Sequence, residues 1–281
     1  MTVLGENRYG KSRVRVMKVD REGERHRVQE WNVEVWLKGD FRGCFEDGDN
    51  SHILPTDTMK NTVYYLARLT QATTIEEFAT ELVTYLLRNN PQVDEAGAGI
   101  SATPWVPLLA GAQEHGTAFM QTGTVRDTAT VSGSRGSAVK VSAGFSNLAL
   151  LKTANSGFAG YIKDRLTTLK ETHDRLLGTL ASGEWDYTDG DDYKGARHRI
   201  IDALLNAFAV HDSLSVQQTL YSMGEAALRA EPGISQIRLS MPNKHCNLVD
   251  LSPFGADNPN QIFVPTDEPH GSIEATVRRT D

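Results

Sequence analysis

The segment Gln29-Glu-Trp-Asn-Val-Glu-Val-Trp-Leu37 places an apolar residue at every second position from Trp31 onward. A period of two is typical of a β-strand that buries one face. Ser12 to Val19 alternates in the same way, and the polar stretch Arg21–Glu24 lies between the two segments. The sequence therefore predicts that the chain begins with a β-hairpin.

Two helices are predicted to follow this hairpin. Apolar residues recur at helical spacing from Met59 to Ala67. A second helix is predicted to open at Thr74, because Glu77 lies three residues later and the two can form a capping box. Asn89-Asn90-Pro91 is expected to end it, since proline disfavours helix in the residue before it.

The order of elements repeats. Ile100–Val106 and Thr117–Val125 are predicted to form a second hairpin, so the first half contains two strands, two helices and two strands. The second half shows the same order, with strand signals at residues 138–153 and 175–187, helix signals at 200–208 and 216–228, and strand signals at 234–241, 245–251 and 272–277. Such a repeat predicts an α+β protein of two similar domains, residues 1–135 and 136–281, each an antiparallel sheet with two helices on one face.

Composition excludes several classes of protein. The net charge of −7 comes without a basic stripe, which argues against nucleic-acid binding. Cys44 and Cys246 lie far apart, and the histidines are dispersed, so neither a disulfide framework nor a metal site is expected. No apolar run approaches the length of a membrane span, and the N-terminus lacks an apolar signal segment.

The stretch Leu239–Ser252 contains Pro-Asn-Lys-His at residues 242–245, between flanks that alternate like strands. This pattern predicts a hairpin with an amide, an amine and an imidazole at its tip. A lone histidine is usually structural and an Asn-Lys pair is usually a turn. However, the segment resembles the Pro-Asn-Lys-His motif of the urate oxidase (uricase) family, and Pro55–Thr62 resembles the Thr-Asp motif of the same family. Further matches extend the resemblance over nearly the whole chain.

This resemblance implies a fold, an assembly and an activity. The fold would be two tandem tunnelling-fold (T-fold) domains, which assemble into a barrel-like homotetramer with active sites at subunit interfaces. The activity would be the oxidation of urate by dioxygen and water to 5-hydroxyisourate and hydrogen peroxide, on the way to allantoin. No cofactor or metal is implied, and dioxygen is a co-substrate. The chain ends in Arg278-Arg-Thr-Asp281 rather than Ser-Lys-Leu, so a cytoplasmic, bacterial protein is expected.

Three residues match the catalytic positions of the family: Lys11, Thr56 and His245. A threonine hydroxyl is a poor base, but a neutral lysine amine hydrogen-bonded to it can draw its proton away. His245 would complete the proton relay. From the residues alone, Lys11 in Tyr9-Gly10-Lys11 would be an exposed lysine at a strand end, and Thr56 would be a helix N-cap.

A second set of residues matches the urate-binding positions: Thr56, Asp57, Phe158, Arg175, Val216, Gln217 and Asn243. Phe158 would stack on the purine, and Arg175 would grip it with its planar fork. Val216 and Gln217 would face the pyrimidine edge, and Asn243 would share with Thr56 a pocket for dioxygen or water. In the absence of the resemblance, a core aromatic, a surface arginine and a solvent-facing glutamine are the ordinary interpretations.

Two other functions fit the same fold. One is a different T-fold purine or pterin enzyme, although those with zinc need Cys and His ligands that the sequence does not supply. The other is a non-catalytic purine-binding T-fold oligomer, but Lys11, Thr56 and His245 are all present. Two departures from the family pattern, His173 for a tryptophan and Cys246 for an aromatic residue, concern local packing.

Overall fold

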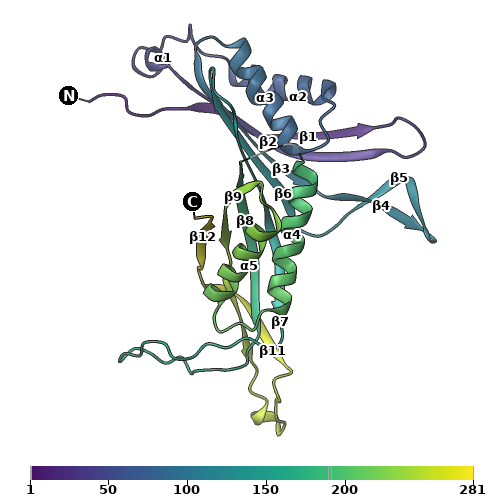
Figure 1. Ribbon diagram of the computed structural model, residues 1–281, viewed down its shortest axis with the longest axis vertical. Coiled ribbons are helices and arrows are strands. Elements are labelled where there is room, and N and C mark those ends of the chain that lie inside the picture. Colours follow the sequence, from purple (N-terminus) through teal and green to yellow (C-terminus); the bar gives the residue numbers. More distant parts are fainter. Residues whose placement is uncertain (1, 189, 191, 281) are drawn as a thin grey trace. The chain divides into compact units, whose positions relative to one another are not determined.

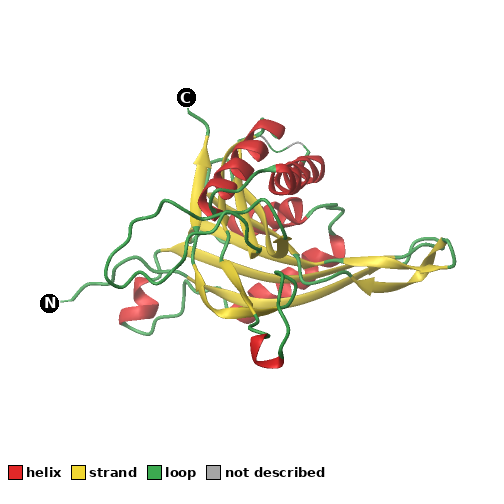
Figure 2. Cartoon of the chain, turned by 90° about the horizontal axis from the view of Figure 1, so that it is seen from below, coloured by secondary structure: helices red, strands yellow, loops and turns green. Residues whose placement is uncertain are grey.

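A computed structural model describes residues 2–188, 190 and 192–280. The chain divides into two compact units, one running up to Phe145 and including the residues around Tyr193, the other comprising Ser146–Thr188 and the residues from Gly195 onward. Strands account for most of the regular structure (Figure 2). The domain boundary expected at residues 135 and 136 stays a prediction.

The first unit is an antiparallel sheet (Figure 1), whose strands lie in the order β1 (Tyr9–Asp20), β2 (Arg27–Gly39), β3 (Val93–Thr103), β6 (Arg126–Ser134) and β7 (Lys140–Lys152). The unit boundary falls within β7. In the β1–β2 pair, Val14 lies opposite Val33 and Val16 opposite Trp31, so apolar side chains share one face. The hairpin predicted at the start of the chain is confirmed.

Three helices belong to this unit: α1 (Arg42–Glu46), α2 (Thr56–Leu69) and α3 (Ile75–Asn89). The predicted capping box is present, because the Glu77 amide donates to the Thr74 hydroxyl at 3.3 Å and the Thr74 amide donates to the Glu77 carboxylate at 3.0 Å. Phe78 of α3 stacks on Trp31 of β2 with ring centroids 4.7 Å apart. The helices α2 and α3 therefore cover one face of the sheet, as expected.

The second predicted hairpin is wrong in its extent, because Trp105 and Val106 pair with Gln121 and Met120 but residues 100–103 belong to β3. The strands β4 (Trp105–Ala110) and β5 (Gln113–Gln121) form a separate two-stranded sheet, and β3 pairs with β6 instead. Leu109 and Met120 are exposed, so the alternation in this segment does not mark a buried face. The sheet partner β6 buries only small side chains such as Ala129 and Val131, which give a weak hydrophobic signal.

The second unit contains β8 (Leu177–Tyr187), α4 (Tyr193–Val210) from Gly195 onward, α5 (Val216–Ala230), β9 (Ile234–Ser240), β10 (Asn243–Leu248), a 3-10 turn (Ser252–Phe254), β11 (Phe263–Gly271) and β12 (Glu274–Arg278). Here α5 packs on β9 and β12, and Trp185, Ile200 and Leu220 are fully buried. The predicted order of strands and helices is confirmed. We did not predict β11, which is largely exposed and carries two prolines.

The hairpin predicted around Pro242 is also wrong. The strand β9 pairs with β8 and β12, whereas β10 pairs with β8 and β11. Ser240 lies opposite Ser182 and Asn243 lies opposite Thr179, so β9 and β10 follow one another along β8 in one register. Pro242 interrupts this line because proline has no amide N–H to donate. Asn243 therefore lies within the sheet and not at the tip of a turn.

No helix among residues 2–188, 190 and 192–280 is long and apolar enough to cross a membrane. The cytoplasmic location expected from the sequence stays a prediction.

Candidate active site

The first unit holds Lys11 near the start of α2. The Tyr9 hydroxyl donates to the Leu54 carbonyl at 3.2 Å and accepts from the Leu54 amide at 2.8 Å. Burial raises the pKa of Tyr9, which keeps the phenol protonated and able to donate. Because Leu54 lies two residues before Thr56, Tyr9 ties the strand that carries Lys11 to the beginning of the helix. A register shift in the β1–β2 pairing follows Lys11 directly.

Thr56 is the first residue of α2, and the expectation that it caps the helix is wrong. The N-cap is Pro55, which makes no side-chain capping bond, and the first intrahelical bond runs from the Met59 amide to the Pro55 carbonyl at 3.1 Å. Within the described chain, the Thr56 hydroxyl makes no hydrogen bond. The amides of the first turn have no intrahelical acceptor, which makes this helix end a suitable site for an anion.

The carboxylate of Asp57 points along the helix. It accepts hydrogen bonds from Lys60 and from Asn61, the latter at 3.1 Å. These bonds, with the one from Lys60 foremost, hold the pKa of Asp57 below its usual range, and the charge of Lys11 lowers this pKa further. Lys11 is therefore within electrostatic reach of the first turn of α2. Because the Asp57 carboxylate is bound to Lys60 and Asn61, the backbone amide of Asp57 is the group of this residue that can face a ligand.

Three segments of the second unit are joined by backbone hydrogen bonds. They run from Ser213 N to Asn155 O (3.0 Å), Gly157 N to Ser213 O (2.7 Å), Phe158 N to Thr172 O (2.7 Å), Thr172 N to Phe158 O (3.0 Å) and Arg175 N to Ser156 O (2.7 Å). The structure thus brings together Phe158, Arg175 and the connection that leads into α5.

Phe158 and Arg175 are in direct contact. The guanidinium carbon of Arg175 lies 5.3 Å from the centroid of the Phe158 ring, and Tyr161 stacks on the same ring at 4.9 Å. Phe158 is only partly buried, so it is not a core aromatic. Sequence reasoning missed Tyr161; its signal was an aromatic residue three positions after Phe158 in the same segment.

Arg175 lacks the partners that a partly buried arginine normally has. Its Nε is buried and makes no hydrogen bond, and no carboxylate among the described residues pairs with it. Burial lowers the pKa of Arg175, because desolvation disfavours the charged form. An anion from outside the chain would stabilise the charged form of this guanidinium, because it would supply the missing charge-assisted hydrogen bonds.

The N-terminus of α5 follows shortly after Ser213, which is hydrogen-bonded to the segment that carries Phe158. Ser215 caps the helix and accepts from the Gln218 amide at 3.1 Å. Val216 is 3% exposed, whereas Gln217 is exposed and its side chain has no partner within the described residues. The helix end favours negative charge, and Gln217 can offer both a donor and an acceptor.

Asn243 and His245 both lie on β10. Asn243 is opposite Thr179 on one side and Gly271 on the other, and His245 is exposed and opposite Thr266. In the part of the chain that the structure describes, neither side chain makes a hydrogen bond, whereas Lys244 between them pairs with Asp267. Asn243 and His245 are thus the polar groups of this motif that remain available to a ligand.

The structure therefore places the matched residues in two groups. Lys11, Thr56 and Asp57 lie in the first unit. The second unit contains Phe158, Arg175, Val216, Gln217, Asn243 and His245. The role of each residue stays a prediction. No group of three or more His, Cys, Asp or Glu side chains within residues 2–188, 190 and 192–280 is arranged to hold a metal ion.

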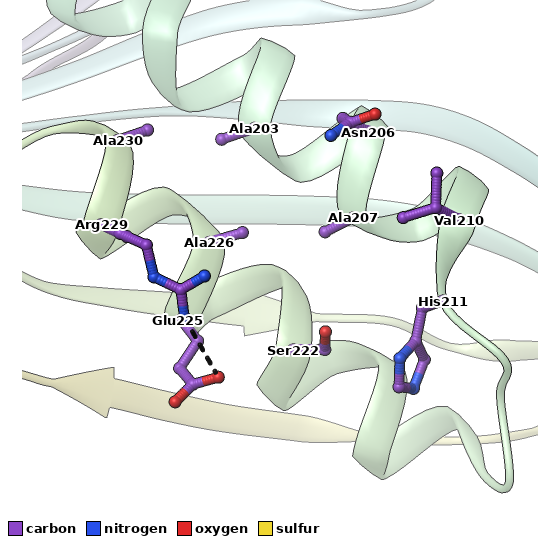
Figure 3. Close-up of a pocket in the computed structure, with 10 residues that line it drawn as sticks. All are labelled: Ala203, Asn206, Ala207, Val210, His211, Ser222, Glu225, Ala226, Arg229 and Ala230. Carbon is purple, nitrogen blue, oxygen red and sulfur yellow. Dashed lines mark ion pairs between the residues drawn. The ribbon is translucent and has the colours of Figure 1, made fainter.

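A groove of about 420 Å³ lies between α4 and α5 (Figure 3). Small side chains such as Ala203, Ala207 and Ala226 face each other across it, and His211 lines it where α4 ends. It contains none of the matched residues, so this groove is separate from the candidate site.

Comparisons with known proteins give the same family along the chain. The family model described as Uricase matches residues 7–132 and 141–274. A uricase from Arthrobacter globiformis is 42% identical in an alignment of 281 positions that covers 99% of this chain and 90% of that protein. A uricase from Oryctolagus cuniculus is 34% identical, covering 96% of this chain and 93% of its own length.

Solved structures agree with the fold. The crystal structure of the Arthrobacter globiformis uricase superimposes with a TM-score of 0.94 at 41% identity, covering 99% of this chain and 96% of that one. A uricase from Bacillus fastidious gives a TM-score of 0.86 at 24% identity, with 98% and 94% covered, and this likeness bears on the fold alone. The two T-fold domains expected from the sequence are confirmed, and the chain belongs to the uricase family.

Proposed function

We propose that this protein oxidises urate with dioxygen and water to 5-hydroxyisourate and hydrogen peroxide, without a metal or organic cofactor. The observation that carries the proposal is Arg175, a partly buried guanidinium whose Nε has no hydrogen-bond partner among the described residues and which lies over the Phe158 ring. Urate is a planar purine that is a monoanion near neutral pH. A flat apolar wall beside an unpaired planar cation suits such a ligand.

Binding is divided over both edges of the purine. Arg175 would hold a carbonyl and a ring nitrogen with its fork, while the Val216 amide and the Gln217 side chain face the pyrimidine edge. The Thr56 hydroxyl and the Asp57 amide, at the start of α2, would face the five-membered ring.

The relay of Lys11, Thr56 and His245 would remove a proton and generate the urate dianion, which is rich enough in electrons to reduce dioxygen. Dehydrourate or a peroxide adduct follows, and water held near Thr56 and Asn243 adds its oxygen to the purine. One urate, one dioxygen and one water then give one 5-hydroxyisourate and one hydrogen peroxide, so the atoms balance. The protein contributes positioning, deprotonation and exclusion of bulk water.

The complete site would form between subunits of a homotetramer. The relay pair Lys11 and Thr56 belongs to the first unit, and Phe158 and Arg175 belong to the second. We propose that the first group of one chain meets the second group of its neighbour, as the family resemblance implies. A purine-binding oligomer without activity remains the alternative; the presence of Lys11, Thr56 and His245 favours the oxidase.

The reaction is tested by following urate absorbance and hydrogen peroxide release under air and under nitrogen. The protein is first dialysed against a strong chelator, and its metal content is checked by elemental analysis. We expect full activity under air after chelation and none under nitrogen. Absence of urate loss under air would refute the oxidase, and activity restored only by one added metal would refute the cofactor-free mechanism.

Arg175→Ala is expected to weaken binding of xanthine, a purine with the same pyrimidine edge as urate, measured by calorimetry under nitrogen. Loss of a charge-assisted pair costs about 2–3 kcal/mol, which corresponds to roughly 30- to 160-fold in Kd. Arg197→Ala is a matched control, because Arg197 also lies 5.3 Å from an aromatic centroid, that of Trp185. Equal affinity of the wild type and the Arg175 variant would remove Arg175 from the site.

A further inference from the structure

Lys152, at the end of β7, is a charged residue that the proposed reaction does not use. It is only 8% exposed, and its ammonium group donates to the carbonyls of Ala209 at 3.1 Å and His211 at 2.6 Å. No carboxylate pairs with it in the described ranges of the chain. Burial of an ammonium group is unfavourable unless its hydrogen bonds are satisfied, so these carbonyls are the groups that keep Lys152 inside.

The carbonyls bound by Lys152 belong to the end of α4 and to the connection into α5. The last carbonyls of a helix have no intrahelical donor and carry partial negative charge, so a cation there is stabilising. Figure 3 shows Val210 and His211 at this end, where the chain leaves α4 and turns toward α5. Lys152 therefore fixes the point from which the connection starts.

Further hydrogen bonds connect the α4–α5 connection to the candidate binding site. Two residues after His211, Ser213 pairs with Asn155 and Gly157 through the backbone. The Thr219 hydroxyl of α5 then donates to the Ser213 hydroxyl at 2.7 Å. The first turn of α5, with Val216 and Gln217, is thus attached to a connection whose other end Lys152 holds.

We propose that Lys152 is a positioning residue of the purine site. It would hold the α4–α5 connection so that the Val216 amide and the Gln217 side chain meet the pyrimidine edge of the substrate. This inference rests on the proposed function, since it assigns those two groups to urate. It predicts an effect on binding and not on the relay, because the Lys152 ammonium group donates to Ala209 and His211 and to none of Lys11, Thr56 and His245.

The chain offers a matched control at the other end of α5. Arg279 donates to the carbonyls of Leu228, Glu231 (3.1 Å) and Ile234 (3.1 Å), so it is also a cation that holds the carbonyls beyond a helix end. None of these residues belongs to the candidate site. Arg279→Met removes the same kind of bond as Lys152→Met and should cost stability alone.

The test compares Lys152→Met and Arg279→Met in the full chain. Kd for xanthine is measured by calorimetry under nitrogen, KM and kcat for urate under air, and Tm for both variants. We expect Lys152→Met to raise Kd and KM about tenfold, the size of losing one good hydrogen bond to the ligand. We expect kcat to stay within about twofold, because the relay is untouched. Arg279→Met should lower Tm and leave Kd and KM unchanged.

A double variant tests whether Lys152 acts through the start of α5. In a Gln217→Ala background, the increase in Kd for xanthine caused by Lys152→Met should be several-fold smaller than in the wild type. The reason is that the contact between Gln217 and the ligand is already absent there. Full additivity would overturn the proposal, as would an unchanged Kd in folded Lys152→Met. If Lys152→Met does not fold, Lys152→Gln, which keeps an amide donor, must show the weaker binding.

Failure of both Lys152 variants to fold, while Arg279→Met folds, would show that Lys152 serves the fold only and would refute the inference. These outcomes differ from failure of the proposed function, in which the wild type itself would not consume urate under air.

Discussion

Lys11→Ala is expected to lower kcat for urate oxidation about 10²- to 10⁴-fold, the usual contribution of a positioned acid or base. The reason is that the Thr56 hydroxyl, which makes no hydrogen bond within the described chain, would lose the amine that we propose accepts its proton. Xanthine binding should change little, because Arg175, Phe158 and the start of α5 are intact. Stopped-flow kinetics at saturating urate, with calorimetry under nitrogen, separates the two effects.

Lys18→Ala is the control for this prediction. Lys18 lies on the same strand and donates to the Thr70 carbonyl at 2.8 Å, at the other end of α2 from Thr56. Its removal should lower Tm and leave kcat unchanged. A Lys11 variant with wild-type kcat, or one that loses affinity for xanthine while kcat stays high, would contradict the role of Lys11 in the relay.

The sequence could predict those parts of the fold in which residues close together in the chain determine the local structure. The capping box at Thr74 and Glu77 depends on residues three apart, and it forms as expected. The alternation of Gln29–Leu37 marks a strand with one buried face, and Val33, Val35 and Leu37 are fully buried or nearly so. Each of these signals lies within a single element, so no long-range information was needed.

The predictions were wrong where the structure of a segment depends on which distant strand it pairs with. Pro242 begins the polar stretch Pro-Asn-Lys-His, and the local pattern of this stretch is that of a turn. In the structure, β9 and β10 both have β8 as their neighbour, and β8 lies about 60 residues earlier in the chain. A proline, which has no amide N–H, can end a strand of a hairpin or interrupt a line of strands that continues beyond it. The sequence near Pro242 does not distinguish these two cases.

The candidate site shows the same division. Motifs made Lys11, Thr56 and Arg175 candidates for the site, because residue types and their spacing can be read directly from the sequence. The bonds of Tyr9 to Leu54, the unpaired Nε of Arg175 and the buried Lys152 could not be predicted. Each of these depends on which groups meet across the fold, and burial and pairing determine what an ionisable group can do there.

Mixed oligomers of two inactive variants are expected to recover activity. Lys11→Ala and Arg175→Ala proteins are unfolded, mixed in equal amounts and refolded, and urate loss is measured at a concentration below the wild-type KM. If each site takes Lys11 from one chain and Arg175 from its neighbour, random assembly gives about one site in four with both residues intact. Activity should therefore rise from near zero to about a quarter of the wild-type value.

The matched control mixes Lys11→Ala with Thr56→Ala. Both residues lie in the first unit, so every site formed by these chains still carries one defective relay residue, and no recovery is expected. Mass spectrometry of the oligomers under native conditions must show that mixed species are present in both experiments. A site closed within one chain would give no recovery in either mixture, because each chain keeps its own defect. Recovery in the first mixture alone requires that two chains build the site together, and it would also explain why the two groups of residues occupy separate units of one chain.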